Sequence, residues 1–119
     1  MGHFHETLRE LGPPTRELRR RIPEAYAGFL QLAQGAVADG DIPARIKEAM
    51  AVAIAVTHGC EECIAHHAKA AARQGTTEQE MAEALGVALL MAGGPASTMA
   101  PTAWQAFQEF REDLEPAAS

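Results

Sequence analysis

The chain has 119 residues, enough for one domain with its own hydrophobic core but short of what two domains need. Hydrophobic residues make up 47% of it and aromatic residues only 5%, a balance typical of closely packed, alanine-rich helices. The net charge of -6, without a run of five or six like charges, argues against a nucleic-acid partner, because phosphate binding needs a clustered basic surface. We interpret the one basic cluster, at 16–21, as a solvated helix face.

The N-terminal residues lack the basic start and apolar core of a signal peptide, and Glu6 stands where a myristoylation signal has Ser or Thr. No apolar run approaches the roughly 18 residues of a membrane span. We therefore expect a cytoplasmic protein that does not contact a membrane. In that compartment two cysteines three residues apart indicate redox or metal chemistry rather than a structural staple.

The first third of the chain predicts three helices. Residues 4–11 can form a short one, which the Gly-Pro-Pro segment at 12–14 should terminate, because proline removes an N–H donor. A second helix should begin at Thr15 and end at Pro23. That proline also suits the first turn of the next helix, whose apolar residues follow a 3.6-residue period and which Gly40 closes.

The middle of the chain predicts two helices joined by a tight turn. Asp41 can cap the first, which covers 44–56 and is apolar nearly all round. Such a helix should be covered on every side, by its own domain or by a neighbouring subunit. The turn falls at 57–59 (Thr-His-Gly), and the second helix should run from 60 or 61 to about 73.

Two further helices complete the chain. Thr77 and Glu80 form a capping box for a helix over 78–92, whose latter half is again apolar on all sides and predicts a buried oligomer interface. The last helix should start between 95 and 101 and reach about 113. No strand pattern is visible. The expected fold class is all-α, a single-domain, oligomeric bundle of about six helices.

Chemically versatile residues gather in the stretch 47–67, which holds both cysteines and three of the five histidines. At 100° per residue, Cys60, Cys63 and His67 share one helix face. If the turn folds the two helices back antiparallel, Glu48 and His67 come to the same height, so that carboxylate and imidazole can meet directly or through one water.

These residue types suit redox catalysis. A helix N-terminus lowers a thiol pKa and so favours the nucleophilic thiolate, which by this argument is Cys60. His67 can take the proton, and Glu48 can fix its tautomer. The second cysteine then resolves a sulfenic acid to a disulfide.

Other interpretations of the same residues stay open. The two cysteines can be inert, small hydrophobic side chains in the core. Together with His66 or His67 they can also hold zinc, although only three ligands converge and no second Cys/His pair follows. His58 is most simply a residue at a helix C-terminus.

The spacing Glu48-x11-Cys60-x2-Cys63-x3-His67 resembles the pattern of the alkyl hydroperoxidase D-like branch of the carboxymuconolactone decarboxylase family. The similarity covers about residues 20–112. Further likeness lies downstream, in Gly-Gly-Pro at 93–95, Ala-Pro at 100–101 and the helix at 106–110.

The resemblance implies an all-α fold assembled as homotrimers or homohexamers, with the site near subunit interfaces. It implies that Cys63 attacks a hydroperoxide, that Cys60 resolves, and that Glu48 and His67 relay protons. A lipoylated or thioredoxin-like protein would reduce the disulfide, and neither a cofactor nor a metal is implied.

With this resemblance we divide the chain into an N-terminal helical arm (1–20), an alkyl hydroperoxidase D-like domain (21–113) and a C-terminal tail (114–119). The chain departs from the best-known peroxidases of the branch at Glu62, where they carry a second histidine between the cysteines. An acidic neighbour raises a thiol pKa rather than lowering it. For the nucleophile we follow the resemblance and choose Cys63, because a base within reach acts more locally than a helix dipole.

We therefore expect a thiol-dependent peroxidase or disulfide oxidoreductase that reduces hydroperoxides. One alternative is a lactone decarboxylase of the same fold, acting on a carboxylated, muconolactone-like acid. The other is a non-enzymatic helical oligomer that senses redox state.

Overall fold

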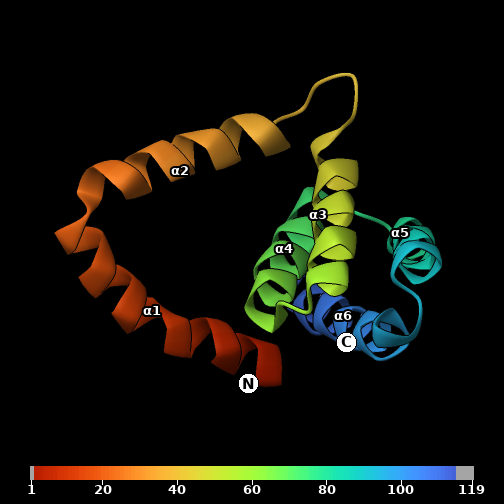
Figure 1. Cartoon of the computed structure of the whole chain (residues 1–119). Coiled ribbons are helices and arrows are strands. Elements are labelled where there is room, and N and C mark those ends of the chain that lie inside the picture. Colours follow the sequence, from red (N-terminus) through yellow and green to blue (C-terminus); the bar gives the residue numbers. More distant parts are fainter. Residues whose placement is uncertain (1, 115–119) are drawn as a thin grey trace, which may run out of the picture.

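The computed structural model describes residues 2–114, which contain six α-helices and the loops that join them (Figure 1). They are α1 (His3–Arg21), α2 (Pro23–Val37), α3 (Ala44–His58), α4 (Glu61–Gln74), α5 (Glu78–Ala92) and α6 (Gly94–Glu112). No strand lies within these residues, so the all-α prediction is confirmed. The predicted tail falls, apart from Leu114, outside the described residues.

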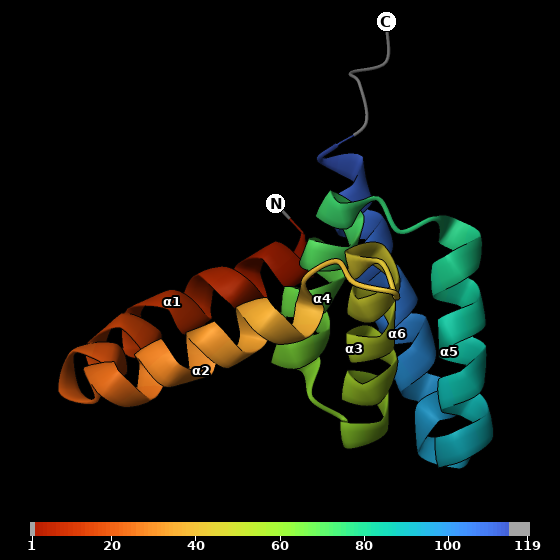
Figure 2. The ribbon, with the colours of Figure 1, turned by 90° about the horizontal axis from the view of Figure 1, so that it is seen from above.

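The core lies between α3, α4, α5 and α6, with α3 and α4 packed side by side at its centre (Figures 1 and 2). Alanine occupies many of the buried positions, which lets the helices approach one another closely. Larger buried side chains fill the remaining space; the largest are Phe107, Phe110, Ile64, Met81 and Val52. Among the described helices, none is long and apolar enough to cross a membrane.

Helices α1 and α2 extend away from this core as a V (Figures 1 and 2). From here on the arm means both of these helices, residues 3–37, and not only the predicted 1–20. Only the first turns of α1 dock on the core. Phe4 is buried there, and the carboxylate of Glu109 accepts the backbone N–H groups of Phe4 (3.3 Å) and His5 (2.7 Å). Helix α2, in contrast, buries none of its residues within the chain.

The break expected at Pro13 and Pro14 is wrong, because α1 continues through both. Proline already has a helical φ, and the two carbonyls that lose a partner belong to exposed residues one turn earlier, which water reaches. Gly12 lacks the Cβ that would meet the following proline ring. The hydroxyl of Thr15 also donates to the carbonyl of Leu11 (2.7 Å).

Side-chain oxygen atoms cap the starts of α3 and α5. The hydroxyl of Thr77 accepts the N–H of Glu80 (3.0 Å), whose carboxylate accepts the N–H of Thr77 (2.9 Å), so the predicted capping box is confirmed. The predicted cap by Asp41 is wrong. Pro43 holds the N-cap position without a side-chain acceptor, and Asp39 reaches across the preceding loop to accept the N–H of Ala44 (2.7 Å).

Candidate functional site

The turn between α3 and α4 positions the site. Gly59 has a φ of 68°, in the left-handed region that favours glycine, and its N–H donates to the carbonyl of Val56 (3.2 Å). The N–H of Cys60 donates to the carbonyl of Ala55 (3.2 Å). These hydrogen bonds end α3, and the turn reverses the chain so that α4 runs antiparallel to α3.

A disulfide joins Cys60 and Cys63 at the start of α4, with their Cα atoms 5.2 Å apart. Cys60 is the N-cap residue, and its Sγ accepts the N–H of Cys63 (3.2 Å). Cys60 is half-buried and Cys63 is exposed. Cys63 is therefore the more accessible residue of the pair.

The carboxylate of Glu48, on α3, meets the imidazole of His67, on α4. Oε1 of Glu48 lies 2.7 Å from Nδ1 of His67, as the antiparallel arrangement predicts. Glu48 is only 5% exposed, so little water reaches its carboxylate. The hydrogen bond with His67 offsets the free energy that this loss of hydration costs. Because the carboxylate accepts the Nδ1 proton, a neutral His67 presents Nε2 as a base.

A hollow of about 520 Å³ connects the sulfur atoms to this acid–base pair. Its lining residues are Ala51, Ile54, Ala55, His58, Cys60, Cys63 and His67. The hollow thus combines two sulfur atoms, an imidazole backed by a buried carboxylate, and an apolar wall from α3. Sequence reasoning did not place His58 here, although its position two residues before Cys60 is a signal that could have done so.

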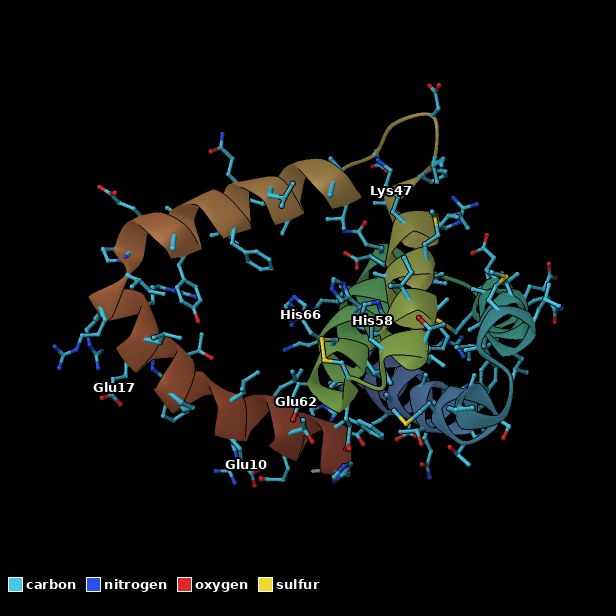
Figure 3. The ribbon with its side chains drawn as sticks, in the orientation of Figure 1. Glu10, Glu17, Lys47, His58, Glu62 and His66 are labelled. Atoms are coloured by element: carbon cyan, nitrogen blue, oxygen red, sulfur yellow. A yellow bond between two sulfur atoms is a disulfide. The ribbon has the colours of Figure 1, made fainter. Side chains whose placement is uncertain are left out.

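His66 lies beside this group, with its ring edge-on to that of His67 and the centroids 5.0 Å apart. The pKa of His66 is lowered, first because protein atoms replace part of the surrounding water, and then because of the neighbouring His67. Figure 3 shows His66 and Glu62 on the side of α4 that faces the arm. Glu62 is exposed, while its neighbour Glu61 pairs with His3.

Cys60 and Cys63 thus share a hollow with His67, and Glu48 stands behind that imidazole. The catalytic roles of these four residues stay predictions. In the part of the chain that the structure describes, no three His, Cys, Asp or Glu side chains are grouped so as to hold a metal ion.

The fold and the site define an all-α protein with a cysteine pair at the turn of an antiparallel helix pair. The chain belongs to the carboxymuconolactone decarboxylase family, whose model matches residues 23–109. The alkyl hydroperoxidase D-like branch is consistent with this match. The family resemblance drawn from the sequence is confirmed.

Similar proteins agree with this family and fold. A carboxymuconolactone decarboxylase family protein from Legionella pneumophila, solved as an apo crystal structure, is 35% identical with a TM-score of 0.87, over 91% of this chain and 96% of that one. An uncharacterized protein from Cupriavidus necator is 35% identical over 96 residues, 81% of this chain and 85% of the relative. Uncharacterized protein 4 in the cox locus of Paracoccus denitrificans is 41% identical over 68 residues, 57% of this chain and 61% of the relative.

Proposed function

We propose that this protein is a thiol-dependent peroxidase or disulfide oxidoreductase that cycles Cys60 and Cys63 between dithiol and disulfide. One observation carries the proposal: a disulfide at a helix start shares a hollow with a histidine that a buried carboxylate orients. A structural role for the disulfide needs no such acid–base pair, whereas thiol chemistry does.

In the proposed cycle, His67 takes the proton of Cys63 and the thiolate attacks a hydroperoxide. A sulfur–oxygen bond forms, the oxygen–oxygen bond breaks, and the alkoxide leaves as an alcohol with the proton from His67. Glu48 stabilises the imidazolium while it exists. The thiol of Cys60 then attacks the sulfenic acid on Cys63, so that water leaves and the disulfide forms.

The exposure of the two cysteine residues supports this division of roles. Cys63 is exposed and can meet both the hydroperoxide and the reductant, while Cys60 is half-buried. During reduction a dithiol attacks Cys63, and Cys60 leaves as a thiolate that the helix start stabilises. We propose a lipoylated or thioredoxin-like protein as the reductant and the cytoplasm as the compartment, because dithiols are kept reduced there.

A thiol count tests the proposal. Fully reduced protein receives one equivalent of cumene hydroperoxide, and free thiols and mass are followed against time. We expect two thiols to vanish within seconds and the mass to fall by two hydrogens. Cys60→Ser should stop at a sulfenic acid on Cys63 that dimedone traps, and Cys63→Ser should not react. Survival of both thiols for many minutes would overturn the proposal.

Two further assays separate the alternatives. Decarboxylation of a muconolactone-like acid needs no cysteine pair, so a Cys60→Ser/Cys63→Ser variant that retains such activity would replace the redox proposal. A non-enzymatic redox sensor would lose its thiols to the hydroperoxide, yet it would show no turnover when dihydrolipoamide or reduced thioredoxin is supplied.

A further inference from the structure

A second hollow, of about 590 Å³, lies between α1 and α4. Four basic side chains line it, Arg16 and Arg19 from α1 and Lys69 and Arg73 from α4. His66 lines it as well, and none of its lining residues is acidic. The hollow is therefore a positively charged concavity in a chain whose net charge is -6.

The positive charge of this hollow is not neutralised by ion pairs. Elsewhere in the described residues, three arginines pair with carboxylates, Arg9 with Glu6, Arg45 with Glu80 and Arg111 with Glu78. Within residues 2–114 no carboxylate lies within ion-pair distance of the four basic side chains of the hollow; Arg19 packs over the ring of Tyr26 instead, 5.5 Å from its centroid. A ligand that brings negative charge would supply the missing partner.

Gly12 leaves room for one of these cations. A Cβ at this position would lie 3.1 Å from Nη1 of Arg16, closer than ordinary contact. The guanidinium of Arg16 therefore lies against α1 one turn earlier, beside another lining residue of the hollow. Leu8 and Leu11 form an apolar part of the same wall.

The hollow lies along the same stripe of α4 as the reactive sulfur. Cys63, His66, Ala70 and Arg73 follow one another at intervals of three and four residues, which places them on one helix face. At a rise of 1.5 Å per residue, Lys69 lies about 9 Å and Arg73 about 15 Å along the axis from Cys63. Along the axis of α4, His66 comes between Cys63 and these two cations. Its side chain faces the arm (Figure 3).

We propose that this hollow binds the carboxylate of an amphipathic hydroperoxide, a fatty-acid-like molecule whose oxidised carbon lies roughly 9–15 Å from its carboxylate. Arg16, Lys69 and Arg73 hold the carboxylate, and the chain runs along Leu8 and Leu11 past His66 to Cys63. The apolar wall favours such a molecule over a free inorganic anion. The inference rests on the proposed function, and the bond changes at Cys63 are those given above.

The test compares linoleic acid hydroperoxide with its methyl ester, using the second-order rate constant for thiol loss in reduced protein. In the wild type we expect the acid to react at least about tenfold faster than the ester, because charge-assisted contacts hold its carboxylate. Arg73→Gln should lower this ratio severalfold, because it removes one of the three cations, whereas Arg20→Gln, which removes a charge from α1 outside the hollow, should keep it. An acid-to-ester ratio near one in the wild type, or an unchanged ratio in Arg73→Gln, overturns the inference.

The two proposals fail in distinguishable ways. If cumene hydroperoxide oxidises the thiols but the acid has no advantage, the redox proposal stands and the anion site is wrong. If no hydroperoxide reacts, calorimetry with dodecanoate on the oxidised protein still tests the hollow: binding by the wild type that Arg73→Gln weakens about tenfold supports it. Inorganic phosphate that binds as tightly as dodecanoate would overturn the amphipathic ligand.

Discussion

At the scale of single residues, the buried carboxylate of Glu48 has the clearest consequence. It orients the imidazole of His67 from 2.7 Å and is positioned to stabilise its protonated form. Glu48→Gln keeps the shape but removes the charge, so we expect thiol oxidation by cumene hydroperoxide to slow by about 10²–10⁴-fold. Stopped-flow thiol counting measures this, with Glu17→Gln, an exposed position on α1, as the control. A Glu48→Gln rate within twofold of the wild type would remove Glu48 from the mechanism.

The same pair matters for stability. His67→Ala removes the hydrogen-bond partner of a nearly buried carboxylate, and we expect the free energy of unfolding to fall by about 1–3 kcal/mol. His58→Ala is the matched control, because it truncates the same residue type at an exposed position at the end of α3. Urea titrations of both variants should show the larger loss for His67→Ala; equal losses would mean that the pair contributes nothing.

At the scale of elements, the glycine turn between α3 and α4 carries a prediction. Gly59 has a φ of 68° with open space around it, so Gly59→Ala should cost about 1–2 kcal/mol through backbone strain alone. Gly28→Ala, within helix α2 and equally free of clashes, should instead be neutral or add about 0.5–1 kcal/mol. Thermal unfolding of both variants distinguishes a backbone effect from a general intolerance of added methyl groups.

We expect the docking of α1 on α6 to depend on pH. The hydrogen bond with Asp113, together with that of Glu109, raises the pKa of His5, although loss of water around the ring opposes this. A raised pKa stabilises the fold fully below the unfolded value of about 6.5, and this contribution is lost as pH rises through the folded pKa. The difference in unfolding free energy between wild type and His5→Gln should therefore be larger at about pH 5.5 than at about pH 8.5.

His66 supplies a control of opposite sign. Burial lowers its pKa, so its charged form is disfavoured in the folded protein and stability is lost as pH falls through about 6.5. The unfolding free energy of His66→Gln relative to wild type should therefore improve toward low pH. If the unfolding free energies of His5→Gln and His66→Gln, each relative to wild type, changed in the same direction with pH, the two opposite pKa shifts would be contradicted.

At the scale of the whole molecule, the chain exposes more surface than a compact monomer. Its accessible area is 7709 Å², against about 6,200 Å² expected for 12.7 kDa, and its radius of gyration is 14.8 Å, against about 13.5 Å. Much of the arm and of α5 is apolar, with Phe29 68%, Leu32 67%, Leu90 81% and Met91 76% exposed. Because α2 buries no residue of its own, we propose that further copies of this chain cover these faces.

Light scattering tests this assembly. We expect a mass three or six times that of one chain. Leu90→Glu, which places a charge on the apolar end of α5, should shift the mass toward the monomer. Gln105→Glu adds the same charge at an exposed polar position on α6 and should leave it unchanged. A monomeric wild type at micromolar concentration would contradict the homotrimer and the homohexamer alike.

Local signals in the sequence predicted much of this molecule. The capping box at Thr77, the glycine turn and the spacing that brings Glu48 to His67 all depend on helix geometry within a few turns. The unbroken α1 could not be predicted in the same way, because contacts with α6 hold its start and water solvates the carbonyls that Pro13 and Pro14 leave free.

The hollow between α1 and α4 escaped prediction for a related reason. From the sequence of α1 alone, the basic cluster at 16–21 is predicted to be a solvated helix face. Only the tertiary fold brings Lys69 and Arg73 opposite two of its arginines, some fifty residues away in sequence. The periodicity of α2 likewise identified an apolar face without indicating that no other described part of the chain buries it.

The sulfur of Cys60 is also the cap of α4, because it accepts the N–H of Cys63 at 3.2 Å. A disulfide sulfur is a weak acceptor and a thiolate a strong one, so reduction that leaves Cys60 as a thiolate strengthens the first turn of the helix. Reduction of the disulfide and the stability of the first turn of α4 are therefore thermodynamically coupled. A protein that docks on this end of α4 and loosens that turn would make the disulfide harder to reduce, without touching either sulfur atom.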